Sequence, residues 1–473
     1  MRTQCFTIAF CILMAAVNSA PAQAFTNLHN FVFTNGTTPV AGLIASGNTL
    51  FGTTSDYGGG TGGGSGSVFR LNTDDTSFTN LHTFTQGADG GNLVGSLVLA
   101  GNNLYGTALF GGASNYGCVF AINTDGSGLT NIYNFSALVY GGPTFGTNSD
   151  GAYPQCGLVL SGNTLYGTAN AGGTIEWGTL FAVKTNGSAF TNLHNFGLAD
   201  GQYPSGNLLL SGDTLYGVTA DGGANGYGTI FKLNTNGTSF TNIYSFTTKS
   251  FGSSPSTNDD GAFPNSYLTL SGNTLFGTAS EGGRFGNGTV FKLGTDGSQF
   301  AVLHHFSATN AATAVNSDGA DPQSGLILLS NALYGTAFGG GDNGTGALFR
   351  LNTDGSGFTT LYSFSATNNL AGTNLDGAHP VGGLLLSGGS LYGTTSRGGT
   401  AGYGTLFSLL LPPPLYIALS GTNVILTWPA NITGFNLEST TNLSSQVWTA
   451  VSGQNQVTNP IVGTQKYYRL KHP

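Results

Sequence analysis

The sequence predicts an all-β fold of tandem repeats, and three observations carry this prediction. A Leu-Tyr/Phe-Gly landmark recurs at spacings of 54, 61, 50, 60, 58 and 58 residues. Short apolar segments surround each landmark, and turns rich in Asn, Asp and Gly separate them. The repeat region also begins with the last segment of the repeat and ends without that segment. A period of this length in β-forming residues is typical of a modular β architecture. The landmark glycines are Gly52, Gly106, Gly167, Gly217, Gly277, Gly335 and Gly393.

Each repeat contains four predicted strands, which we name a, b, c and d. Strand a is a Leu-rich run such as 157–160, and strand b is the landmark run such as 164–168. Strand c is exemplified by 228–233 and strand d by 240–246. Ser-Gly-Asn/Asp-Thr joins a to b, and Asn-Thr-Asp/Asn-Gly-Ser/Thr joins c to d. Asn, Asp and Gly tolerate the positive φ of tight hairpin turns, so we expect a–b and c–d hairpins.

The order of the strands predicts a closed ring. A strand d comes first, at 25–31, whereas the last a-b-c set, at 383–409, lacks one. Pairing of these two segments completes the final sheet and leaves no unpaired edge. We therefore predict a seven-bladed β-propeller closed by an N-terminal strand; an open β-solenoid is the alternative. The a-b-c sets are 42–71, 96–122, 157–184, 207–233, 267–293, 325–351 and 383–409, and the d strands are 25–31, 78–84, 129–135, 190–196, 240–246, 300–306 and 358–364.

The first residues have the features of a secretory signal peptide. Arg2 precedes an apolar run from Phe6 to Val17, and Ala22-Gln23-Ala24 is a small-x-small cleavage site. We assign residues 1–24 to this peptide. A retained membrane anchor is the alternative, although the run is short for a span of ~20 residues. Since no later segment is apolar enough to cross a bilayer, we expect a secreted or cell-surface protein.

The mature chain is acidic and nearly free of thiols. Without Arg2 it carries 11 basic and 20 acidic residues, a net charge of −9, which argues against nucleic-acid and anionic-lipid partners. Cys118 and Cys156 remain after cleavage. A disulfide between them is the alternative to buried free thiols. We favour free thiols because Cys118 occupies a position that serine or threonine fills in other repeats.

The composition changes after residue 410, where the propeller region 25–410 is predicted to end. A proline linker at 411–414 leads into residues 415–473, which lack glycine doublets and contain two tryptophans. We expect a small β-sandwich here. Leu426-Thr427-Trp428-Pro429 and Tyr467-Tyr468-Arg469-Leu470 resemble the B-strand Trp and F-strand Tyr of fibronectin type III modules, which are Ig-like. The expected strands are 416–420, 423–428, 435–439, 447–451 and 466–470.

The repeat motifs themselves resemble a known family. L-Y-G-T-T/A-x-x-G-G, G-T-h-F-K-L-N-T-D-G-S (h apolar), F-T-x-L-H-x-F and D-G-A-x-P together are similar to the GloVer tandem repeat of bacterial choice-of-anchor extracellular proteins, over residues 25–409. The Gly-Gly doublets and the repeat length also resemble kelch propellers, although the kelch pattern is not reproduced. The resemblance implies a secreted or surface-displayed repeat protein, and it brings no assigned catalytic residues.

The b–c loops and d–a connections are expected on one face of the ring, opposite the tight turns. Loops of this kind on a rigid scaffold often carry function. An Asp-Gly pair recurs in the d–a connections, either as a turn or as a ring of carboxylates around the channel mouth that holds a cation or sugar hydroxyls. No single loop has calcium-binding spacing. The carboxylates taken as candidate ligand contacts are Asp150, Asp200, Asp260 and Asp376.

Aromatic residues precede strand c in four repeats, where other repeats carry Ser65, Asn287 or Thr345. These rings are candidate stacking platforms for sugars; the alternative is that each ring packs against the loop of the next blade. Trp177 is our first candidate, since its loop replaces the usual glycines with Thr-Ile-Glu. The four aromatic residues are Tyr116, Trp177, Tyr227 and Tyr403.

The histidines are mostly expected to be structural. Four of them share one strand d position with tyrosines of other repeats, which favours a flat ring with a polar tip over catalysis. His379 differs, because Asp376-Gly-Ala-His-Pro380 places it beside a carboxylate on the loop-rich face; we include it among the candidate ligand residues. The shared position holds His29, His82, Tyr133, His194, Tyr244, His304 and Tyr362.

No catalytic triad elbow, phosphate loop or zinc motif occurs in the sequence, so we expect no catalytic residue, cofactor or metal. The hypothesis is a monomeric, non-enzymatic binding scaffold for an extracellular polysaccharide or a surface protein. The alternative is a polysaccharide-active lyase or glycosidase that uses channel-mouth carboxylates or His379 with Asp376; a glycosidase needs two carboxyl groups ~5–9.5 Å apart. A third hypothesis is a spacer in a surface assembly.

Overall fold

The computed structural model describes residues 24–56, 65–140, 146–250, 255–368, 371–413, 415–420, 423–428, 436–442, 447–453, 455–460 and 466–471. The predicted signal peptide lies outside the described residues, apart from Ala24. The chain divides into a compact unit from Ala24 to Leu411 and a smaller one that begins at Pro412. Within the described ranges, no helix has the length and apolar character needed to span a membrane.

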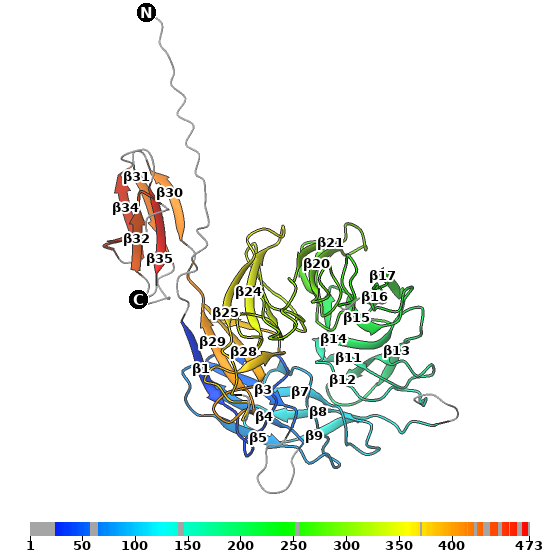
Figure 1. Ribbon diagram of the computed structural model, residues 1–473. Helices are drawn as coiled ribbons and strands as arrows, with labels where there is room; N and C mark the ends of the chain where they lie inside the picture. Colours follow the sequence, from blue (N-terminus) through cyan, green and yellow to red (C-terminus); the bar gives the residue numbers. More distant parts are fainter. Residues whose placement is uncertain are drawn as a thin grey trace, which may run out of the picture. The chain divides into compact units, whose positions relative to one another are not determined.

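Seven antiparallel sheets build the larger unit within the described residues (Figure 1). Six have four strands in the predicted order a-b-c-d, and the seventh has five. Sheet 1 contains β2 (Ile44–Ser46), β3 (Thr49–Thr54), β4 (Ser67–Asn72) and β5 (Thr79–Thr83); sheet 2 contains β6 (Val98–Ala100), β7 (Asn103–Ala108), β8 (Cys118–Asn123) and β9 (Thr130–Asn134); sheet 3 contains β10 (Val159–Ser161), β11 (Thr164–Ala169), β12 (Thr179–Lys184) and β13 (Thr191–Asn195); sheet 4 contains β14 (Gln202–Ser211), β15 (Thr214–Asp221), β16 (Thr229–Asn234) and β17 (Thr241–Ser245); sheet 5 contains β18 (Thr269–Ser271), β19 (Thr274–Ala279), β20 (Thr289–Gly294) and β21 (Ala301–His305); sheet 6 contains β22 (Ile327–Leu329), β23 (Ala332–Ala337), β24 (Ala347–Asn352) and β25 (Thr359–Ser363); sheet 7 contains β26 (Ala378–Pro380), β27 (Leu385–Ser387), β28 (Ser390–Arg397), β29 (Thr405–Leu410) and β1 (Phe25–Asn30).

The landmark glycine is required by the packing inside each sheet. In sheet 3, Gly167 of β11 lies opposite Phe181 of β12. A Cβ atom at Gly167 would lie 2.7 Å from Cζ of Phe181, too close for any side chain. The same approach of a strand c phenylalanine occurs at the landmark glycine of every sheet. The landmark therefore marks the place where the tip of an aromatic ring approaches the backbone of strand b.

The N-terminal segment pairs with the last sheet, as the strand order predicts. Phe25 pairs with Leu409 and Asn30 with Thr405, and Figure 1 shows β1 in blue beside β29 in orange. The ladder shifts register between Asn27 and His29. The c–d ladders of sheets 1 to 6 shift at the corresponding place, for example opposite Leu180 and Phe181. Residues 25–30 thus form a strand d in pairing and in bulge geometry.

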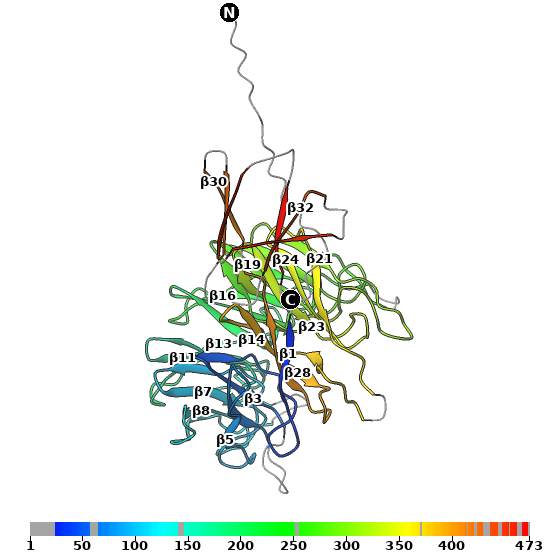
Figure 2. The same cartoon turned by 90° about the vertical axis from the view of Figure 1, so that its left-hand side faces the viewer.

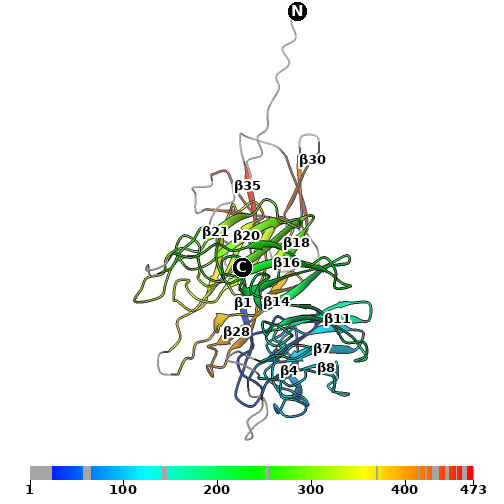
Figure 3. The same cartoon turned by 90° about the vertical axis from the view of Figure 1, so that its right-hand side faces the viewer.

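Seven buried clusters join neighbouring sheets, and they follow one another in a closed cycle. Six clusters each combine residues of two sheets that are consecutive in the chain. The seventh joins sheet 7 to sheet 1 through Phe31, Leu50, Phe69, Tyr392 and Leu406. Figures 2 and 3 show strands of the first sheets, β7, β8 and β11 among them, from two sides. The larger unit is an all-β, propeller-like arrangement whose core is divided among its junctions.

The smaller unit consists of two three-stranded antiparallel sheets in its described part. One sheet contributes Leu426, Trp428 and Val457 to a shared core, and the other contributes Leu437 and Leu470. The sequence analysis missed the strand at 456–460, whose Gln-Val-Thr-Asn-Pro sequence has a single large apolar residue. The strands are β30 (Tyr416–Ser420), β31 (Asn423–Thr427) and β34 (Gln456–Pro460) in one sheet, and β32 (Asn436–Thr440), β33 (Thr449–Val451) and β35 (Tyr467–Lys471) in the other.

The two cysteines of the larger unit are free thiols. Cys118 and Cys156 are buried and unpaired. Burial raises the pKa of Cys118 to about 12 and that of Cys156 to about 11. Thiolates, which are the reactive form, are therefore scarce at neutral pH.

Candidate functional site

The Asp-Gly pairs fasten each d–a connection to the strand d that precedes it. Asp150 accepts hydrogen bonds from the Tyr133 hydroxyl and the Ser136 amide, both at 2.8 Å, and from the Ser136 hydroxyl. The ring at the shared strand d position makes the corresponding contact, at 2.7–3.2 Å, in all seven repeats. The pairs are His29–Asn35, His82–Asp89, Tyr133–Asp150, His194–Asp200, Tyr244–Asp260, His304–Asp318 and Tyr362–Asp376.

These contacts correct the idea of an open carboxylate ring. Asp150, Asp260 and Asp376 are only 4%, 5% and 7% exposed, and donors of their own connection and strand d surround each carboxylate. Asp200 is more open, but its carboxylate contacts His194 at 2.8 Å. None of the four lines the pocket formed where the connections converge. Buried carboxylates need hydrogen-bond donors, and these carboxylates find them in their own connection and strand d, so we assign them a structural role in the turn.

The same strand d rings also hold neighbouring sheets together. Tyr133 stacks on Phe190 of the next sheet with ring centroids 3.8 Å apart, and His194 stacks on Phe240 at 3.7 Å. Burial raises the pKa of Tyr133, and its hydrogen bond to Asp150 adds to the effect. Burial lowers the pKa of His194, against the opposing influence of Asp200. The expectation of structural rather than catalytic rings agrees with this geometry.

A recurrent asparagine, which the sequence analysis missed, completes the long connections. Asn148 Oδ1 accepts the amides of Gly151 and Gly173, both at 2.9 Å, and its Nδ2 donates to the carbonyls of Ser136 and Gly151. This one side chain therefore joins the connection to the b–c loop of the next sheet. The signal was present as Asn-x-Asp-Gly in four repeats, at Asn148, Asn258, Asn316 and Asn374.

Two residues after the glycine of the Asp-Gly pair, each connection forms a hydrogen bond with the b–c loop of the preceding sheet. We call this contact the latch. Tyr203 donates its amide to the Trp177 carbonyl at 3.1 Å, and Pro204 packs against the site of Gly178, which has a φ of 102°. The donating residue has positive φ in all seven repeats, which is uncommon outside glycine. The latches are Thr38–Tyr403, Asn92–Ser65, Tyr153–Tyr116, Tyr203–Trp177, Phe263–Tyr227, Asp321–Asn287 and His379–Thr345.

This latch explains where the predicted aromatic residues lie. The rings of Tyr116 and Tyr153 have centroids 5.5 Å apart, and those of Trp177 and Tyr203 meet edge to face at 5.5 Å. Tyr403 faces Thr38 across its latch and is 39% exposed. Three of the four predicted rings therefore pack against the connection to the next sheet, as the alternative expectation had it, while remaining partly exposed.

The third of these pairs carries a cation. The rings of Tyr227 and Phe263 lie 5.7 Å apart, and Lys249 Nζ lies 4.6 Å from the Phe263 centroid and 5.6 Å from that of Tyr227. Glu281 pairs with the same ammonium group at 2.5 Å. The aromatic pair at this junction is thus covered by a neutralised charge.

His379 does not form a dyad with Asp376. Its Nδ1 lies 3.0 Å from the Phe338 carbonyl, and its ring stacks on Phe338 at 4.6 Å. Asp376 is bound instead by Tyr362 and Ser365. Burial lowers the pKa of His379, and nearby Arg397 adds to this effect. A catalytic His379–Asp376 pair is therefore wrong for this chain.

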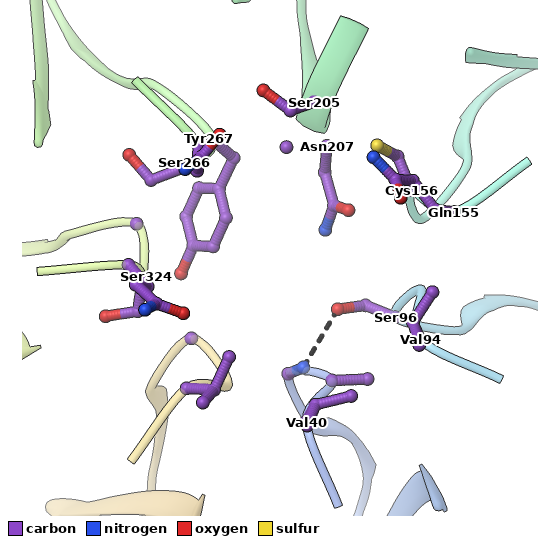
Figure 4. Close-up of a pocket in the computed structure, with 18 of the residues that line it drawn as sticks. Val40, Val94, Ser96, Gln155, Cys156, Ser205, Asn207, Ser266, Tyr267 and Ser324 are labelled. Atoms are coloured by element: carbon purple, nitrogen blue, oxygen red, sulfur yellow. Dashed lines mark hydrogen bonds between the residues drawn. The ribbon is translucent and has the colours of Figure 1, made fainter. Parts of the chain in front are cut away.

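A pocket lies where the seven connections converge, just before each strand a (Figure 4). Its volume is about 340 Å³, and every sheet contributes to its lining. The lining contains amides, hydroxyls and small apolar side chains but no charged residue. One repeat position supplies six of the lining residues: Gly42, Ser96, Asn207, Tyr267, Gly325 and Gly383. We call this the axial pocket.

No group of three or more His, Cys, Asp or Glu side chains suited to a metal occurs in the part of the chain that the structure describes. The axial pocket offers no carboxylate, and the carboxylates of the connections are engaged by their own turns.

Known proteins are similar to this chain in its fold and in its repeat. No curated protein has a matching sequence. Among solved structures, the fold is similar to the GH74 enzyme of Niastella koreensis, with 14% identity and a TM-score of 0.48 over 95% of this chain and 73% of that one. It is also similar to PorZ, a surface component of the type-IX secretion system of Porphyromonas gingivalis, with 14% identity and a TM-score of 0.49 over 93% of this chain and 58% of that one. The model of the Gloeobacter/Verrucomicrobia repeat matches residues 16–147, 142–316 and 311–415. The chain therefore belongs to the Gloeobacter/Verrucomicrobia repeat family.

Proposed function

We propose that the protein is a secreted or cell-surface binding scaffold that holds an extracellular glycan or protein on its loop-rich face. In this proposal residues 1–24 are a signal peptide and residues 25–410 form a seven-bladed β-propeller closed by the N-terminal strand. The linker at 411–414 leads to a small β-sandwich at 415–473. The scaffold acts as a monomer and without catalysis.

The observation that carries this proposal is the run of aromatic pairs at three consecutive junctions. Tyr116–Tyr153, Trp177–Tyr203 and Tyr227–Phe263 occupy the same latch position in sheets 2 to 5. Partly exposed rings on a rigid backbone can stack on sugar rings or on protein side chains at little entropic cost. The pairs form a row because the latch repeats from sheet to sheet. We call these three pairs the aromatic row.

Exposed apolar side chains accompany this row. The hydroxyl groups of Tyr140 and Tyr116 lie 3.4 Å apart, and Tyr140 is 61% exposed. Ile175 and Leu198 are 50% and 66% exposed on the loops that adjoin Trp177. Apolar groups that cluster on an otherwise polar face often mark an interaction site. This supports a ligand-facing role for the predicted contacts Tyr116 and Trp177, whereas Lys249 lies over the ring of Tyr227.

Binding to insoluble polysaccharides tests the proposal. The mature protein is mixed with cellulose, chitin, xylan or pectin, and the fraction of protein retained on the solid is measured. Reducing-sugar and unsaturated-uronate assays on the same samples measure product release. We expect retention without product release. Release of reducing ends or unsaturated uronates would favour the enzyme instead.

Substitution of Trp177 by serine connects retention to the row. Serine is found at this latch position in sheet 1, so the backbone accommodates it. We expect about tenfold weaker retention, because stacking and hot-spot aromatics typically contribute more than 1 kcal/mol. Asn287→Ser at the same position of sheet 5, which lacks an aromatic residue, is the matched control and should bind like the unaltered protein. Equal binding by both variants would remove the aromatic row from the proposal.

A further inference from the structure

We infer that the axial pocket binds one uncharged, polyhydroxylated ring, such as a neutral hexose, with Tyr267 and Asn207 as its central contacts. This inference is independent of the proposed aromatic row, since the two sites share no residue. The volume of the axial pocket, about 340 Å³, is near the lower end for small-molecule pockets, which suits a single ring rather than a polymer.

The lining determines the class of ligand. Its polar side chains are amides and hydroxyls, including Gln155, Asn207 and Gln323, and it has no charged group. Uronates, phosphorylated sugars and nucleotides would lose their hydration here without gaining a counter-charge. Amides both donate and accept hydrogen bonds, as sugar hydroxyls do. Val40, Val94 and other apolar side chains suit the C–H faces of a sugar ring.

Tyr267 is the feature that sets this pocket apart within the repeat. The equivalent position carries glycine, serine or asparagine in every other sheet. A Cβ atom at Gly325 would lie 2.5 Å from the Tyr267 ring, and one at Gly383 would lie 2.5 Å from its hydroxyl. These two glycines, which belong to the next two sheets, therefore make room for the Tyr267 ring. Figure 4 shows Tyr267 and Asn207 projecting toward the middle of the pocket.

The polar tips of these residues are free to bind a ligand. Tyr267 is partly exposed, and neither its hydroxyl nor the Gln155 amide has a hydrogen-bond partner among the described residues. Asn207 uses only Oδ1, which accepts the Gly157 amide at 2.6 Å, so its Nδ2 is available. Burial raises the pKa of Tyr267 to about 12, which keeps this hydroxyl a neutral donor.

A simple packing role for Tyr267 is less consistent with these observations. A plug of the axis would need only an apolar ring, and phenylalanine is common throughout this repeat. Instead the hydroxyl opens onto a cavity lined by further amides. A flat ring with converging donors and acceptors is the usual composition of a site for a small polar ligand.

Saturation-transfer NMR and calorimetry on the mature full-length protein test the inference. The probes are D-glucose, D-galactose, D-mannose and N-acetyl-D-glucosamine, with D-glucuronate and glucose 6-phosphate as charged counterparts. We expect binding of at least one neutral sugar and at least about tenfold weaker binding of its charged counterpart. Tyr267→Phe should weaken the neutral sugar about threefold to tenfold through loss of one hydrogen bond.

Matched variants keep the result specific. Tyr166→Phe is the control, since Phe51 and Phe276 already occupy that position in other repeats, and it should leave affinity unchanged. Asn207→Asp retains the acceptor for Gly157 but replaces the free donor with a charge, so it should weaken neutral sugars. Trp177→Ser should not affect the pocket, which separates this site from the aromatic row. Binding of none of the neutral sugars, or equal affinity in Tyr267→Phe and the unaltered protein, would overturn the inference.

Discussion

Replacing Phe31 with alanine tests whether the N-terminal strand is an integral part of the ring. Phe31 follows β1 and is fully buried between sheets 7 and 1, with its ring centroid 5.2 Å from that of Phe69 at 62°. Phe196 follows the strand d of sheet 3 and is also fully buried, 5.1 Å from Phe231 at 60°. The two positions are therefore matched in burial and in geometry, although one is close to the chain terminus.

The expected loss is the same at both positions. Truncation of a fully buried phenylalanine costs about 3–5 kcal/mol. For a unit that spans Ala24–Leu411, the unfolding entropy is on the order of 0.8 kcal/mol/K, so each variant should lower Tm by about 4–6 °C. If residues 25–31 were a loose terminal segment, Phe31→Ala would cost less than about 1 kcal/mol and shift Tm by about 1 °C.

Differential scanning calorimetry of the two variants and the unaltered protein provides the measurement. Urea unfolding followed by circular dichroism at fixed temperature is the second probe, since coincident transitions indicate a single cooperative unit. A Tm shift for Phe31→Ala below about one third of that for Phe196→Ala would refute closure by β1. A comparable shift would show that the ring closes with ordinary packing.

Three further predictions concern the repeated contacts. Tyr133→Phe leaves the buried Asp150 one donor short and should cost about 1–3 kcal/mol by urea unfolding; Tyr216→Phe, at a position where other repeats carry phenylalanine, is the control, and equal stability of both variants would contradict a stabilising Tyr133–Asp150 hydrogen bond. Burial lowers the pKa of His29 to about 4 beside the neutral Asn35, so its contribution to stability is lost as pH falls from 6.5 toward 4; Asn35→Asp should raise that pKa and flatten the loss, and an NMR titration that leaves His29 near 4 would disprove this. Gly167→Ala should lower Tm strongly, because its Cβ would lie 2.7 Å from the Phe181 ring, and an unchanged melting curve would show that the ring can move aside.

The strand pattern of this chain is readable from the sequence because its causes are local. Alternating apolar residues, hairpin turns with Asn-Gly and Asp-Gly, and a repeat that begins with strand d predicted the sheet order and the pairing of β1 with β29. The free thiol state of Cys118 followed from its place in the repeat. The hairpins and the position of Cys118 depend on neighbours within one or two hairpins, whereas the pairing of β1 with β29 joins the two ends of the unit and was predicted from the order of the strands.

The roles of the polar side chains depended on the tertiary structure. Asp150 looked like a channel-mouth carboxylate, yet it is bound by Tyr133, which lies on the preceding strand d and not on the axis. His379 adjoins Asp376 in sequence but bonds to the carbonyl of Phe338 in the preceding sheet. These partners belong to other strands, and only the paths of the connections across the junctions decide which of them meet.

The repeat itself determined that the chain forms β-sheets in a defined order, because hydrophobic period and turn chemistry act over a few residues. The convergence of the seven connections decided the rest. Tyr267 is one residue in a position that is otherwise small, and nothing in its neighbours along the chain marks it as central. It becomes so because every sheet brings the same position to one axis, where a single large ring lies against the glycines of two other sheets.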